Sequence, residues 1–236
     1  MPRWWLCVVV LAAGPCCARS VNFDKAKPGT TPRDWVVAMT HEGGPPKWEV
    51  VDDPGAPSPP RVLAQTSTDN TNARYPLAIY QKAVITDGAA SVRFKTMSGE
   101  KDQAAGIVWR YRDANNYYVV RANALEDNVV LYKVEDGKRI ALAPKGTAAG
   151  TYGVNWKVPR QTWSELRVEF ATTHFTVFFN GEKVMEVEDG TFTGAGRTGL
   201  WTKADSVTWF DNFRVDRGNP RHAGASGASP CRCRDV

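Results

Sequence analysis

The chain contains 236 residues, of which 42% are hydrophobic and 11% aromatic, enough for a sizeable core in one large domain or two small ones. Its formal net charge is +5, and residues 217–236 alone contain four arginines and one aspartate. A surplus that lies mostly in a tail, with no basic stripe, RNP-type motif or zinc finger, argues against a nucleic-acid partner.

The N-terminus has the pattern of a secretory signal peptide at residues 1–18. Arg3 precedes an apolar stretch at 4–13, which is too short for a membrane span, because a spanning helix needs about 20 residues. We place cleavage after Ala18. A lipid anchor is the weaker alternative, since Pro15 precedes Cys16. The pattern predicts export to a secreted or extracytoplasmic location, and no other segment predicts a membrane span.

The cysteines lie at the two ends of the chain. Cys7, Cys16 and Cys17 fall in the predicted signal, and Cys231 and Cys233 fall in the last six residues. A core spanning 18–230 must therefore fold without disulfides, so its stability has to come from burial. Two thiolates are too few for a zinc site, and the alternatives for this pair are free thiols or an intermolecular disulfide.

Short strand patterns follow one another along the chain, with almost no helical periodicity between them. Asn180-Gly181 and Asp136-Gly137 each separate two of these runs, as in tight hairpins. The runs lie at 35–38, 48–51, 61–64, 83–85, 91–97, 105–112, 117–123, 129–135, 139–142, 164–170, 175–179, 183–187, 198–201 and 207–215.

So many strands at this spacing predict an all-β fold, a jelly-roll β-sandwich of two antiparallel sheets over residues 20–216. The Pro-rich run at 54–60 is a loop within this domain, because strand patterns resume directly after it. Residues 217–236 have little apolar content and are predicted to form a disordered basic tail. The sequence does not specify the oligomeric state.

The segment 105–123, AGIVWRYRDANNYYVVRAN, predicts a hairpin with its turn at 113–116. Pairing about this turn places Arg112 opposite Tyr117, Arg110 opposite Val119 and Val108 opposite Arg121. Strict alternation then gives one polar, cationic and aromatic face, and one core face. The first face comprises Arg110, Arg112, Tyr117, Arg121 and Asn123; the second comprises Ile107, Trp109, Tyr111, Tyr118 and Val120.

Arginines in the middle of strands favour a ligand-binding face. Their fixed fork of donors suits sugar hydroxyls or a carboxylate, and Tyr117 would add a stacking surface. The alternative is that Arg110 and Arg121 pair with acids such as Glu126 on a solvated face. Glu126 lies in a turn that continues directly from the hairpin.

A second cluster, Trp201, Lys203 and Asp205, follows the strand at 198–201 and is predicted to lie on a loop at a sheet edge. Loops at such positions often carry binding residues. The alternative is a plain turn, in which Asp205 caps backbone amides and Lys203 is solvated.

Neither a metal site nor conventional hydrolase chemistry is indicated. His41, His174 and His222 have no metal-ligand spacing and form no Ser-His-Asp set. We predict no cofactor, although the acids of the turn at 52–53 leave a divalent cation such as calcium open. The three-carboxylate strand of laminarinase-type glycosidases is missing: Glu165 and Glu169 flank Arg167, and the run at 186–189 lacks the last acid.

Four motifs, in this order, resemble one family: FDKAKPGTTPRDW, AAGIVWRYRDANNYYVVRANALEDNVVLYKVEDGKR, WSELRVE and GRTGLWTKADSVTWFDNFRV. They are similar to the concanavalin A-like, laminin G-like jelly roll of the 3-keto-disaccharide hydrolases, over residues 22–216. This resemblance implies the same sandwich and a carbohydrate ligand. It also implies that Lys203 and Asp205 lie near the binding face.

Three classes of function stay open at this point. An enzyme of this type would cleave a 3-keto-glycoside after removing the C2 proton, with Asp205 or Glu126 as base and Arg110, Arg121 and Lys203 holding the oxyanion. A lectin-like module would bind a sugar through the same face without turnover, and a cell-surface module would bind a protein there. The substrate-binding candidates are Arg110, Tyr117, Arg121, Asn123, Trp201 and Lys203.

Overall fold

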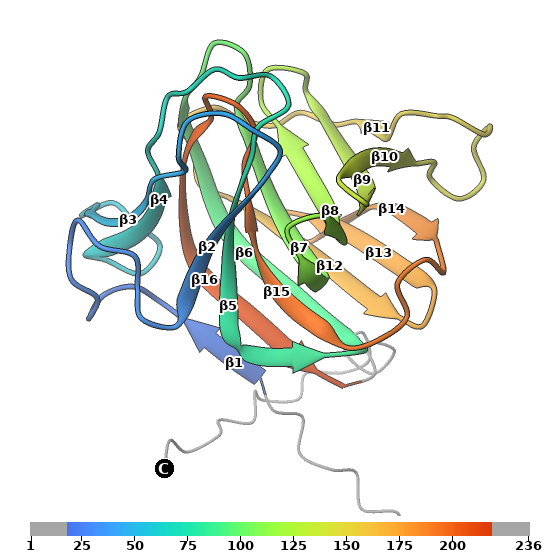
Figure 1. The fold of residues 1–236 in the computed structure, drawn as a ribbon, viewed down its shortest axis with the longest axis horizontal. Helices are drawn as coiled ribbons and strands as arrows, with labels where there is room; N and C mark the ends of the chain where they lie inside the picture. Colours follow the sequence, from blue (N-terminus) through green and yellow to red (C-terminus); the bar gives the residue numbers. More distant parts are fainter. Residues whose placement is uncertain (1–17, 219–236) are drawn as a thin grey trace, which may run out of the picture.

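Two antiparallel sheets stack face to face in the computed structural model, which describes residues 18–218 (Figure 1). Sheet A has the order β14 (Glu182–Glu188), β13 (His174–Phe179), β12 (Ser164–Ala171), β6 (Gly88–Ser98), β16 (Val207–Arg217), β4 (Arg61–Gln65) and β3 (Trp48–Asp52), with β1 (Ala18–Val21) paired to β16. Sheet B has the order β10 (Lys138–Leu142), β9 (Asn128–Glu135), β8 (Asn116–Asn123), β7 (Ala104–Asp113), β15 (Gly196–Trp201), β5 (Tyr75–Ile85) and β2 (Trp35–Thr40), with β11 (Val154–Asn155) paired to β9.

This architecture confirms the predicted jelly-roll sandwich. Residues 18–218 contain no helix, and hence none that could span a membrane. The signal peptide predicted at 1–18 and the tail predicted at 217–236 lie outside the described residues, apart from Ala18, Arg217 and Gly218.

The central strands of sheet B are buried on both faces, which sets them apart from the usual half-solvated antiparallel sheet. The main core fills the space between the sheets with side chains such as Trp109, Tyr118 and Phe170. A second cluster, built only from sheet B, covers the opposite face and includes Tyr75, Tyr132 and Trp201. We call this second side the outer face of sheet B. In a strand that is buried on both faces, the sequence is a continuous apolar run and does not alternate between apolar and polar residues.

That double burial explains the largest error in the predicted strands. The sequence pattern predicts only 83–85 as a strand, whereas β5 extends over Tyr75–Ile85. Six consecutive residues at the start of β5 are buried, so the run YPLAIY shows no alternation, and it contains Pro76, a residue that is uncommon inside a sheet. The short strands β1 and β11 were also not predicted.

The hairpin formed by β7 and β8 has a different register from the predicted one. Asp113 pairs with Asn116 at the turn as expected, but Trp109 pairs with Tyr118 and Val108 with Val119. Between these pairs, Arg110, Tyr111 and Arg112 together face only Tyr117. This β-bulge inserts extra residues into β7 and changes which face they occupy.

Arg110 adopts a left-handed backbone conformation at the bulge, with φ of 48°. Gly196 on the adjacent strand β15 approaches this backbone so closely that a Cβ there would lie 2.4 Å from the carbonyl carbon of Arg110. The bulge in β7 therefore depends on a glycine in β15. The pairing of β15 with β5 also shifts between Arg197 and Thr198, so the irregularity continues across the sheet.

We predict that Gly196→Ala destabilises the protein by on the order of 3 kcal/mol, because the new methyl group meets backbone that cannot move aside. Chemical denaturation measures the change in the free energy of unfolding. Gly194→Ala is the matched control, since a Cβ at Gly194 meets nothing within 4 Å. Equal stability of the two variants would contradict this account of the bulge.

Candidate functional site

Arg110 and Arg112 do not lie on the outer face with Tyr117, so that part of the prediction is wrong. Past the bulge, the Arg112 guanidinium lies 4.8 Å from the centre of the Phe192 ring, a core residue. Tyr111, which is predicted on the core face, instead lies on the outer face, where its ring centre is 6.0 Å from that of Tyr117. The bulge exchanges the expected faces of these residues.

The Arg110 side chain is fully buried at one end of the sandwich. It donates hydrogen bonds to the carbonyl oxygens of Thr86 and Phe192, and contacts the Asp87 carboxylate at 3.2 Å. Asp87 also accepts a hydrogen bond from the backbone amide of Thr172. Arg110 therefore ties together the loops at this end, and its donors are already engaged.

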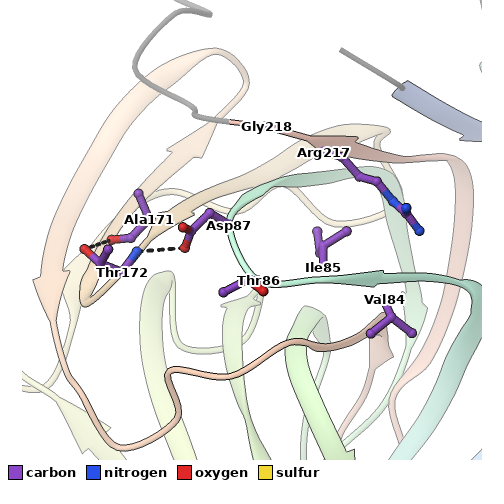
Figure 2. Close-up of a pocket in the computed structure, with 8 residues that line it drawn as sticks. All are labelled: Val84, Ile85, Thr86, Asp87, Ala171, Thr172, Arg217 and Gly218. Atoms are coloured by element: carbon purple, nitrogen blue, oxygen red, sulfur yellow. Dashed lines mark hydrogen bonds between the residues drawn. The ribbon is translucent and has the colours of Figure 1, made fainter. Parts of the chain in front are cut away.

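A cavity of about 540 Å³ adjoins this end, lined by Val84, Ile85, Thr86, Asp87, Ala171, Thr172, Arg217 and Gly218. Figure 2 shows Asp87 turned toward Thr172, whose backbone amide donates to its carboxylate. Because this carboxylate is engaged by Thr172 and Arg110, the cavity offers little unused chemistry. It also lies apart from the residues that the hairpin brings together on the outer face.

The remaining predicted residues of the hairpin do lie on the outer face, and Arg121 is the centre of a hydrogen-bonded group there. Its side chain is 0% exposed, yet it contacts the Glu126 carboxylate at 2.7 Å and the Asn128 side-chain oxygen at 2.8 Å. Asn128 in turn donates to Glu126. Glu126 is thus held from two sides, while its own side chain stays 40% exposed.

The pKa of the Glu126 carboxyl reflects two opposing effects. Burial acts to raise it, and the hydrogen bonds and charge of Arg121, with help from Asn128, lower it further than burial raises it. The net result is a pKa below the ordinary value of 4.5. Glu126 is therefore an ionised, oriented and solvent-accessible carboxylate at neutral pH.

A second charged group, Asp102 with Lys203, adjoins the first. Asp102 is 0% exposed, and its carboxylate accepts hydrogen bonds from the Lys203 ammonium at 2.6 Å and from the Asn123 side chain at 2.8 Å. Burial raises the pKa of Asp102, and Lys203 opposes that rise. The oxygen of the same Asn123 side chain accepts from the backbone amides of Leu125 and Glu126, which connects the two groups.

Asp205 has a supporting position. Its carboxylate accepts hydrogen bonds from the backbone amides of Glu100, Lys101 and Asp102, at 2.7–3.2 Å. This is the amide-capping arrangement that the sequence left as an alternative for Asp205. By fixing the backbone of Asp102, it also fixes the partner of Lys203.

Arg74, which is not among the predicted site residues, holds the other side of the same loop. Its buried guanidinium donates to the carbonyl oxygens of Gly44, Pro45 and Ala204. Ala204 has a φ of 47°, so the loop that carries Lys203 is bent into a conformation that needs such support.

Aromatic side chains fill the rest of the outer face. Tyr75 and Trp201 stack with ring centres 5.3 Å apart, and Tyr117 hydrogen-bonds to Thr40. The predicted binding residues Tyr117, Asn123 and Trp201 are each 0% exposed, so a ligand would not contact their flat surfaces. They form a dry layer beneath the groups that reach solvent.

Those solvent-reaching groups are Glu126, Lys203, Tyr152 and Arg139, which we call the open layer. The Tyr152 side chain comes from the loop before β11, and its hydroxyl hydrogen-bonds to that of Tyr132 at 2.5 Å. The guanidinium of Arg139, on β10, lies 4.5 Å from the centre of the Tyr132 ring. The open layer therefore combines one carboxylate, two cations and one exposed aromatic ring.

Sequence reasoning missed Asp102, Asn128, Arg139 and Tyr152 in this site. Arg139 and Asn128 lie on the two strands that follow the hairpin, so continuing the face alternation across β9 and β10 was the available signal. Asp102 and Tyr152 lie in loops, where no periodicity indicates which side chain turns inward.

Within residues 18–218, no group of three or more His, Cys, Asp and Glu side chains is arranged to hold a metal ion. The acids considered for calcium have other partners: Asp52 contacts Arg61 at 3.1 Å, and Asp53 contacts Lys95 at 2.7 Å.

We predict that Lys203→Met destabilises the protein by about 3 kcal/mol at pH 7, because it leaves the buried Asp102 carboxylate without its cation. Without Lys203, the already raised pKa of Asp102 rises further, so the loss should shrink as the pH falls and Asp102 takes up a proton.

Chemical denaturation at pH 7 and pH 5 measures this effect. Adding Asp102→Asn to Lys203→Met removes the unpaired charge and should restore much of the stability. A double variant no more stable than Lys203→Met would contradict the assignment of the loss to an uncompensated charge.

Comparisons with known proteins agree with this fold. The model of the 3-keto-alpha-glucoside-1,2-lyase-like domain matches residues 22–216. A search of curated proteins found no match.

Among solved structures, the carbohydrate-binding module CBM66 of Bacillus subtilis has a TM-score of 0.57 at 18% identity, covering 77% of this chain and 94% of that one. Domain 4 of the extracellular arabinanase AbnA of Geobacillus stearothermophilus, solved with arabinotriose, has a TM-score of 0.53 at 14% identity, covering 86% and 93%. A Bacillus subtilis protein of unknown function with a galectin-like fold has a TM-score of 0.52 at 12% identity, covering 84% and 98%.

At such identities the structural matches establish a shared fold, and the family follows from the match over residues 22–216. The chain belongs to the 3-keto-alpha-glucoside-1,2-lyase-like family, whose domain is a carbohydrate-active jelly roll.

Proposed function

We propose that this chain cleaves a glycoside oxidised at C3, with Glu126 as the base that removes the C2 proton. The observation that carries the proposal is the Glu126 carboxylate itself, which is 40% exposed and held at 2.7 Å by the fully buried Arg121. A base for this reaction must be ionised, oriented and open to substrate, and among the acids of the outer face Glu126 combines these properties.

The step balances without an oxidant or a metal. Glu126 takes the proton from C2, and the electron pair of that C–H bond forms a double bond between C1 and C2. The C1–oxygen bond breaks, its pair leaves with the aglycone oxygen, and that oxygen receives the proton. The C3 ketone makes the C2 proton acidic by carrying negative charge in the transition state.

Cations near the ketone oxygen stabilise that charge. Lys203 is the candidate in the open layer, because its side chain is 13% exposed and its ammonium is fixed by Asp102. Asp102 and Asp205 then act as positioning residues: the first holds the ammonium, and the second holds the backbone of the first. This gives Asp205 a supporting role in place of the role as base.

Carbohydrate binding without turnover is the second candidate. Its support is the exposed ring of Tyr152 beside the outer face, together with the similarity in fold to a protein named as a carbohydrate-binding module. We also propose that the chain is exported. Cleavage after Ala18 would leave Arg19–Val21 of β1 paired with β16.

We predict that Glu126→Gln lowers kcat/KM on a p-nitrophenyl 3-keto-α-glucoside by about 10³-fold, since the amide cannot accept the C2 proton. Release of nitrophenol measures turnover. Glu135→Gln is the matched control, because Glu135 is 43% exposed and lies at the far end of β9 from Glu126. If the wild type binds the substrate but releases no nitrophenol, the binding candidate replaces the enzyme.

We predict a pH profile of kcat/KM whose acidic limb lies below pH 4.5, because Arg121 and Asn128 hold the pKa of Glu126 below that value. Activity depends on the ionised form, so it is present above this pKa and is lost as the pH falls through it. Arg121→Gln removes the nearby charge and should move the limb to higher pH.

Arg93→Gln, at an exposed ion pair on sheet A, should leave the limb in place. An acidic limb above pH 5 in the wild type would rule out Glu126 as the base in the environment described here.

A further inference from the structure

Arg139 is held in place by aromatic rings. It lies on the edge strand β10, paired with Val134 of β9. Its guanidinium carbon is 4.5 Å from the centre of the Tyr132 ring, 4.9 Å from that of Tyr75 and 5.9 Å from that of Trp201. Three rings from three strands thus fix the position of one cation on the outer face, without using any of its N–H donors.

No described residue accepts a hydrogen bond from the Arg139 guanidinium or forms an ion pair with it. Its Nη1 atom is buried without a partner, and the residue as a whole is half-buried. The three buried arginines all have polar partners: Arg121 pairs with Glu126, Arg110 contacts Asp87, and Arg74 donates to three carbonyl oxygens. Arg139 differs from these three arginines, because rings orient its guanidinium and no described residue uses its donors.

Arg139 is a cation of the open layer that has no carboxylate partner among the described residues. Arg121 is neutralised by Glu126, and Lys203 by Asp102, each at a contact of 2.6–2.7 Å. Within residues 18–218, Arg139 has no such carboxylate. Unpaired charge in a partly dry site is costly, and a bound anion would remove that cost.

The chemistry of that anion follows from the shape of the guanidinium, a planar fork that matches a carboxylate through two parallel hydrogen bonds. We infer that Arg139 forms a subsite for a carboxylate on the sugar, so that the chain prefers uronic-acid glycosides to neutral ones. Arg121 and Arg139 both contact the Tyr132 ring, at 5.6 and 4.5 Å, which places the subsite beside Glu126. The inference rests on the proposed sugar-binding function of this face and adds the class of sugar.

The test compares the affinities of methyl α-glucuronide, methyl α-glucoside and the 6-sulfate of the latter, by NMR titration of the full chain. We expect the wild type to bind the glucuronide at least tenfold more tightly than the glucoside. Arg139→Gln should abolish that preference. Because Arg139 packs on three rings, Arg139→Met, which keeps the apolar stem, is a second neutral variant that should behave in the same way.

Lys138→Gln is the matched control: it removes one charge from the neighbouring, exposed position of β10 and should leave the preference unchanged. Equal wild-type affinity for glucuronide and glucoside would overturn the inference and leave sugar binding intact. A preference for the glucuronide that survives in Arg139→Gln would overturn the assignment to Arg139. Binding of the glucoside 6-sulfate as tightly as the glucuronide would overturn the assignment to a carboxylate. If neither glucuronide nor glucoside bound, the inference would fail, and release of nitrophenol from the 3-keto-glucoside would still test the proposed function separately.

Discussion

The pairing of charges on the outer face of sheet B is the constraint on which the rest of the site depends. The central strands of sheet B are buried on both sides, so a charged side chain that points outward from β8 enters a region with little water. Such a charge is tolerated only with a close partner. Arg121 meets this requirement through Glu126, and Asp102 meets it through Lys203. The two pairs place a carboxylate and an ammonium at the solvent boundary, where a ligand can reach them.

The sequence identified the sandwich and most of its strands, because turn signals and strand composition are local properties. It also identified the correct face for Tyr117, Arg121 and Asn123, since β8 is regular. It misplaced Arg110 because the bulge in β7 depends on close approach by Gly196, which lies far away in the sequence. Side chains alternate between the two faces of a strand only where the strand is regular. In β7 a distant strand imposes a bulge, and no pattern within β7 indicates its position.

The same limit applies to the acids of the site. Asp102, Glu126 and Asp205 all lie in polar turns, and their surroundings in the sequence do not separate them. In the structure, one is buried beside Lys203, one is open to solvent and one caps three backbone amides. Their different roles come from contacts between the loops at 99–103 and 203–206 and the turn after β8. Only the three-dimensional arrangement determines which acid is available as a base.

The dry aromatic layer gives these few exposed groups their chemical strength. Tyr75, Trp201, Tyr117 and Tyr132 exclude water beneath the open layer, so the charges above them act in a medium less polar than bulk solvent. Negative charge that develops on a substrate oxygen would therefore be stabilised more strongly by Lys203 than on a solvated surface. The same layer fixes Arg139 through ring contacts and leaves its donors unused. A face that holds its cations by stacking as well as by ion pairing can orient an anionic sugar while its one accessible carboxylate stays ionised.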